Sequence, residues 1–118
     1  MGTVLGDVKK YVGLASENTE FDEDILMFTN GALSILHQNG VGPAEGMSID
    51  NTTEWAAITT DAKLLNLVKQ FITMKVKVTF DSSTMSSFVL SSYNDMIAEC
   101  IWRINAYTDY WKNQQPSN

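Results

Sequence analysis

The stretch that decides the fold is Ser87–Trp111, SFVLSSYNDMIAECIWRINAYTDYW. Its apolar residues recur at alternating steps of three and four. They are Leu90, Tyr93, Ile97, Cys100, Ile104, Tyr107 and Trp111. Because an α-helix repeats every ~3.6 residues, these positions share one face. The pattern predicts one long amphipathic helix whose apolar stripe packs against the rest of the chain.

Trp102 departs from this pattern. At ~100° per residue it points about 160° away from the centre of the stripe, on the polar side of the helix. Either another helix of the same chain covers it, or another subunit does. The second interpretation is worth testing because tryptophan is enriched at protein interfaces.

Three further helical segments are expected before this one. Thr3–Val12 has valines and a leucine on one face and ends at Gly13, a common helix stop. A second helix begins with Asp22 as its N-cap and ends before Asn39-Gly40, and a third, capped by Thr60, covers about 61–80. The end of the third helix also fits strand alternation, but continuity with the preceding turns favours a helix.

The connection between the second and third helices is expected to be an ordered loop followed by one helical turn that places Trp55 against the core. We therefore predict an all-α fold, a small bundle of about four helices plus a short helical turn, with a long C-terminal helix. The helical domain is expected to cover residues 1–112. Residues 113–118, NQQPSN, are too polar to bury a core and predict a flexible tail.

The sequence also gives expectations for two single residues, Gly31 and Cys100. Gly31 within the second helix is explained either by a close helix–helix approach or as a tolerated defect that costs about 1 kcal/mol relative to alanine. Cys100, the only cysteine, lies in the apolar stripe and is expected to be a buried thiol.

Nothing in the sequence predicts an enzyme, a cofactor or a metal site. The only histidine, His37, has no motif that links it to Cys100 and no neighbouring ligands, so we expect it to be solvated or to cap the second helix. No glycine loop suited to phosphate and no catalytic pair of carboxylates is present. Glu23 and Asp24 are better explained as favourable charges at a helix start.

The net charge is −6, and it is unevenly distributed. Residues 1–59 carry two lysines against nine acidic residues, while 60–118 carry six basic residues against five acidic ones. Without a basic stripe, tight binding to nucleic acid is not expected. No apolar run approaches the ~20 residues that cross a bilayer, so no membrane association is expected. Residues 1–7 are too short and interrupted for a signal sequence, so we expect an intracellular protein.

Several stretches, read in order, resemble one known family. They are Asp7–Leu14 (DVKKYVGL), Phe21–Ile25 (FDEDI), Gln38–Pro43 (QNGVGP), Val68–Val76 (VKQFITMKV) and Phe80–Leu90 (FDSSTMSSFVL). Together they resemble the head–tail connector (adaptor) proteins of tailed bacteriophages and prophages, from Val4 to about Tyr107. Members of that family usually have prolines after the Phe-Asp pair, where this chain has Ser82 and Ser83.

The resemblance implies a helical structural subunit that forms a ring of about a dozen copies beneath the portal protein. Such a ring bridges the portal to the next tail component, a stopper or tail completion protein. It surrounds the passing DNA without sequence-specific binding. The implied location is the virion head–tail junction, after a period in the host cytoplasm.

In such a ring the C-terminal segment engages the portal. With the outward-facing tryptophan, this makes Trp102, Tyr107, Tyr110 and Trp111 the candidate assembly and portal-binding residues. The alternative function is a small cytoplasmic helical adaptor or regulator that binds one partner protein through its aromatic C-terminal face.

Overall fold

In the residues that the structure describes, the chain folds into four α-helices, as predicted. The computed structural model describes residues 2–43 and 45–114, with side chains up to residue 109. The helices are α1 (Val4–Val12), α2 (Asp22–Gln38), α3 (Ala62–Asp81) and α4 (Ser87–Gln114). Two short 3₁₀ turns, η1 (Trp55–Ala57) and η2 (Ser82–Thr84), lie before and after α3. The described residues include no strand, and Thr3 and Glu54 form an isolated β-bridge.

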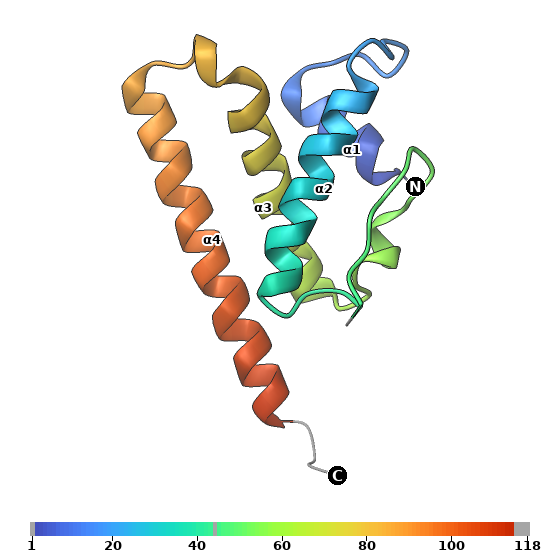
Figure 1. Cartoon of the computed structure of the whole chain (residues 1–118). Helices are drawn as coiled ribbons and strands as arrows, with labels where there is room; N and C mark the ends of the chain where they lie inside the picture. Colours follow the sequence, from blue (N-terminus) through green and yellow to red (C-terminus); the bar gives the residue numbers. More distant parts are fainter. Residues whose placement is uncertain (1, 44, 115–118) are drawn as a thin grey trace.

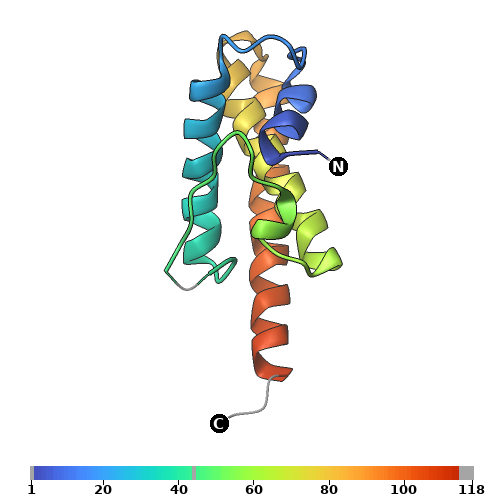
Figure 2. The same ribbon diagram turned by 90° about the vertical axis from the view of Figure 1, so that its right-hand side faces the viewer.

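The central element is α3, which packs against each of the other three α-helices. In Figure 1, α4 lies on one side of α3, while α1 and α2 lie on the other. The C-terminal end of α4 extends past the other helices in both Figure 1 and Figure 2. No helix in the described part of the chain is long and apolar enough to span a membrane.

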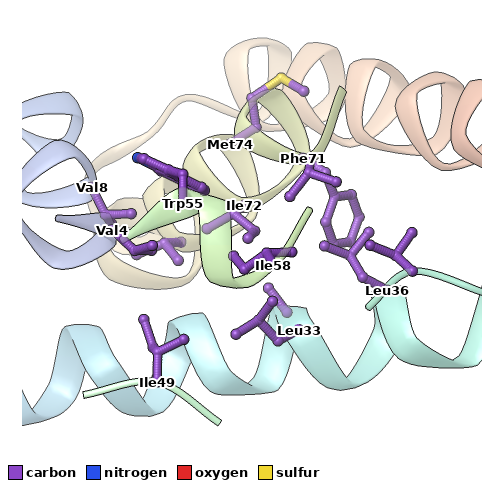
Figure 3. Close-up of a cluster of buried hydrophobic side chains, with 14 of the residues drawn as sticks. Val4, Val8, Leu33, Leu36, Ile49, Trp55, Ile58, Phe71, Ile72 and Met74 are labelled. Carbon is purple, nitrogen blue, oxygen red and sulfur yellow. The ribbon is translucent and has the colours of Figure 1, made fainter. Parts of the chain in front are cut away.

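The core lies between α1, α2 and α3 and is closed by the loop that precedes α3. Figure 3 shows side chains from these helices meeting Ile49, Trp55 and Ile58 of that loop. Trp55 is buried, as predicted, and its indole Nε1 donates a hydrogen bond of 2.7 Å to Asp7 Oδ2. The loop is therefore an ordered part of the core, and α4 adds Cys100 and Ile104 to it.

Three helix ends lie close to where the sequence pattern predicts them: the start and end of α1 and the start of α4. Thr3 caps α1 by accepting a hydrogen bond from the Gly6 N–H, and Gly13 ends it with φ of 89°. The hydroxyl of Ser86 accepts a hydrogen bond from the Val89 N–H at the start of α4. The segment 76–80 is helical, so its strand-like alternation does not determine its structure.

Two predicted N-caps are wrong. The cap of α3 is Asp61, not Thr60, because the Asp61 carboxylate reaches the N–H groups of both Lys63 and Leu64. Asp22 is the first residue of α2 and not its cap. Its carboxylate is instead occupied by an ion pair with the Nζ of Lys9 at 2.9 Å.

That ion pair gives Lys9 a different role from the one its position suggested. It lies in the last turn of α1, where a cation favours the helix dipole, but its side chain is buried. Its Nζ also donates to the Ser16 carbonyl oxygen at 3.1 Å. Lys9 therefore fixes the polar connection between α1 and α2.

Two other details depart from the simple helical pattern. A side chain at Gly31 would meet nothing within 4 Å, so no close helix approach explains this glycine within the chain. Tyr11 of α1 is 43% exposed. Partial burial, with a hydrogen bond to Tyr93, raises the pKa of Tyr11 to about 12.

Candidate docking surface

The two faces of α4 differ as the sequence pattern predicts. On the inner face, Cys100 and Ile104 are buried, and Tyr93 and Ile97 pack against the core cluster while remaining partly exposed. The predicted heptad stripe is therefore used by the fold itself up to Ile104. The side chain of Trp111, at the end of the stripe, lies outside the described residues.

Cys100 is a buried thiol, as expected. Its Sγ donates a hydrogen bond of 3.2 Å to the Leu67 carbonyl oxygen on α3. Burial raises the pKa of the thiol, which keeps it protonated. Cys100 thus acts as a packing residue between α3 and α4.

Trp102 is on the outer face of α4 and is 69% exposed, so no helix in the described part of the chain covers it. The interpretation that another helix of the chain covers Trp102 therefore fails for the described residues, and contact with another subunit stays a prediction. In the next position, the Nη2 of Arg103 forms a 2.8 Å ion pair with Glu99 Oε1, one turn earlier. An exposed tryptophan beside a surface ion pair is typical of the centre and rim of protein interfaces.

The sequence pattern alone did not single out Phe88 and Met96, which are also exposed on α4. Phe88 is 79% exposed and lies fourteen residues, about four helical turns, before Trp102. Both lie off the heptad stripe, a signal that could have identified them. We call Phe88 and Trp102, which lie within about 40° of each other around the helix axis, the outer apolar patch of α4. Met96 lies about 120° from Trp102 and lines a small hollow with Met74 of α3.

Tyr107 lies on the other side of α4 and is half-buried. Its hydroxyl donates a hydrogen bond of 2.6 Å to Asp61 Oδ2 at the start of α3. This bond lowers the pKa of the Asp61 carboxyl and raises that of the Tyr107 hydroxyl. Tyr107 is therefore not on the same surface as Trp102, and the side chains of Tyr110 and Trp111 lie outside the described residues.

Below the core, the projecting end of α4 forms a groove with the rest of the bundle, with a volume of about 690 Å³. Its lining comes from three segments that are distant in sequence: the end of α2, the start of α3 and the inner side of α4. The lining residues are His37, Gln38, Asn39, Gly40, Thr59, Asp61, Leu64, Asn105, Tyr107, Thr108 and Asp109. The described part of the chain contains no group of three or more His, Cys, Asp and Glu residues suited to a metal ion.

A comparison with known protein families identifies the family of this chain. A family model described as "Phage connector protein" matches residues 4–111. The chain belongs to the phage connector family. No curated protein and no solved structure gives a significant match.

The family match begins at the first residue of α1 and ends at Trp111, within α4. This phage connector is thus an all-α structural protein of the virion head–tail junction, whose partners belong to head–tail assembly. Family membership favours the connector over the alternative of a free adaptor or regulator.

Proposed function

We propose that the protein is a subunit of a ring that joins the portal to the next tail component and surrounds the DNA channel. The observation that carries this proposal is the family match over residues 4–111. A ring of about a dozen copies, assembled from protein held in the host cytoplasm, follows from the resemblance to head–tail connectors.

The outer apolar patch of α4 is the proposed contact with a neighbouring subunit. Trp102 and Phe88 are large, exposed and carried by one rigid helix. Burial of such side chains contributes about 25 cal/mol per Å² of apolar surface, so two of them supply a useful part of a subunit contact.

The projecting end of α4 is the proposed contact with the portal. It extends beyond the bundle, and a partner can therefore reach it without opening the core (Figure 1). Tyr107, Tyr110 and Trp111 bring aromatic side chains to this segment. Tyr107 takes part through its ring, because its hydroxyl is used within the chain.

The decisive experiment mixes the purified chain with its portal protein and examines the sample by negative-stain electron microscopy. We expect rings seated on portal particles. Trp102→Ala is expected to abolish them while leaving the melting temperature of the free chain unchanged, because Trp102 is exposed. Met27→Ala, which removes an exposed side chain from α2, serves as the control.

Portal particles that never carry the protein at several salt concentrations would argue against the ring. A Trp102→Ala chain that still forms rings would instead remove this residue from the interface. A melting temperature lowered by several degrees would place Trp102 in a structural role within the chain. The free chain is not the test, since ring subunits are often monomeric before assembly.

A further inference from the structure

The groove beneath the core has a chemistry that differs from that of the outer apolar patch. We propose that it binds a lysine- or arginine-bearing segment of a partner protein. The volume of about 690 Å³ lies within the range of roughly 300–1,000 Å³ that is usual for ligand sites, so a short peptide segment fits.

The described lining favours a polar occupant over a wholly apolar one. Among the eleven described residues that line the groove, Leu64 alone is aliphatic, and the others are mostly amides, hydroxyls and carboxylates. An apolar helix placed here would bury these polar groups without replacing their hydrogen bonds to water, which is unfavourable. A polar or charged segment can satisfy them.

The described residues of the groove favour a cation. Two of the described lining residues are carboxylates, Asp61 and Asp109, and none of them is a lysine or arginine. The hydrogen bond from Tyr107 lowers the pKa of Asp61, so this carboxylate is ionised at neutral pH. The C-terminal end of α2 and the N-terminal end of α3 both lie here, so the opposite partial charges of the two helix ends offset each other and the carboxylates set the sign.

The groove is held open by bonds between its walls. Tyr107 ties α4 to Asp61. The Thr108 hydroxyl lies 3.3 Å from the Asn39 carbonyl oxygen and 3.1 Å from the Asn105 carbonyl oxygen of its own helix, and it can donate to either. Asp61 is also engaged by the N–H groups at the start of α3. Asp109 is exposed and has no ion pair with another described side chain, so it is the carboxylate that a partner's cation can reach.

This inference adds the chemistry of a partner to the proposed function and rests on it only for the partner's place in head–tail assembly. The groove itself can be tested without the virion. A suitable probe is the peptide acetyl-Ser-Arg-Ser-amide, compared with the same peptide carrying citrulline, which has the shape of arginine without its charge.

The full chain, labelled with ¹⁵N, is titrated with each peptide and followed by NMR. We expect the arginine peptide to shift the backbone amides of Asn39, Gly40, Asn105 and Thr108, and the citrulline peptide to leave them unchanged. Asp109→Asn should weaken binding about three-fold, the effect of an exposed ion pair. Asp95→Asn removes an exposed carboxylate of α4 outside the groove and should have no effect.

The proposal would be overturned by no binding of the arginine peptide, by equal binding of the citrulline peptide, or by shifts that lie outside the groove. An equal loss in Asp95→Asn would show a general attraction to an acidic protein and would also overturn it. None of these results affects the ring, whose test is assembly on the portal. Loss of the ring with peptide binding retained would reject the proposed function alone.

Discussion

Asp61 joins two parts of the molecule. One carboxylate oxygen accepts the N–H groups of Lys63 and Leu64 and so starts α3, while the other accepts the Tyr107 hydroxyl from α4. All three bonds favour the ionised carboxylate. The N-terminal residue of one helix thereby positions the projecting end of another.

Tyr107→Phe is expected to raise the pKa of Asp61 toward its ordinary value of 3.8, because the hydroxyl is the largest cause of the lowered pKa. Since the folded-state pKa is depressed, the stability from these bonds is fully present above pH 3.8 and is lost as the pH falls through the lower folded value. Carbon-detected NMR of the Asp61 carboxyl over an acid titration measures the shift. An unchanged pKa in the variant would show that the caps alone set it.

The ion pair of buried Lys9 with half-buried Asp22 gives a second prediction at the residue scale. The Oδ1 atom of Asp22 is buried, and its partner among the described residues is the Lys9 ammonium at 2.9 Å. Lys9→Met leaves this carboxylate without its ion pair and should lower the free energy of unfolding by about 3 kcal/mol.

Urea denaturation of the variant measures this loss. The double variant Lys9→Met with Asp22→Leu removes both charges and should recover most of the stability, as buried ion pairs replaced by apolar residues often do. A double variant that is no more stable than Lys9→Met would show that the loss comes from packing, or from the bond to the Ser16 carbonyl oxygen.

At the scale of helices, the sequence predicts well what depends on local periodicity. The presence and approximate extent of all four helices, the burial of Trp55 and the inner face of α4 follow from apolar spacing and from helix stops such as Gly13. These features depend on residues that are only a few positions apart, so one sequence is enough to predict them.

The features that the sequence did not predict depend on contacts between distant segments. Lys9 meets Asp22 across the first connection, and Tyr107 meets Asp61 across 46 positions. The groove is formed by three separate segments and has no local pattern. Polar contacts of this kind have no regular spacing in the sequence, unlike the residues of an apolar helix face. They can therefore be recognised only in the folded structure.

Gly31 gives a prediction at the level of one helix. It lies within α2, its φ is not positive, and an added Cβ would meet nothing within 4 Å. Gly31→Ala should therefore stabilise the chain by roughly 0.5–1 kcal/mol through lower backbone entropy in the unfolded state. Thermal and urea unfolding of the free chain measure the gain.

Gly13→Ala is the matched control, because an added Cβ there also meets nothing within 4 Å but the backbone has φ of 89°. This left-handed conformation costs an L-residue about 1–2 kcal/mol, so the same substitution should destabilise the chain. A destabilising effect at both glycines would mean that space around the helix, and not backbone conformation, decides the sign.

For the whole molecule, the charge distribution fits a channel that DNA passes without being held. The first 59 residues, which form α1, α2 and the loop before α3, contain nine acidic residues and two lysines. Three of the basic residues of the second half occur in ion pairs or lie over a ring: Lys77 with Asp81, Arg103 with Glu99, and Lys69 at 5.3 Å from the centre of Trp55. These three side chains are therefore less available to a phosphate backbone.

We therefore expect both the free chain and its assembly on the portal to bind DNA weakly. For an arbitrary duplex of about 30 base pairs, we expect a Kd above the range of about 10⁻⁴–10⁻⁶ M that non-specific DNA-binding proteins show at physiological salt. Fluorescence anisotropy at low and at physiological salt measures this.

A variant with Glu23→Lys and Asp24→Lys places cations at the start of α2 and should begin to bind DNA in a salt-dependent way if those residues face the duplex in the ring. The corresponding pair Asp95→Lys and Glu99→Lys on α4 tests the opposite orientation, so the variant that gains DNA binding only when assembled identifies the helix that faces the channel. Salt-dependent binding by the unaltered assembly would contradict a channel that does not grip DNA.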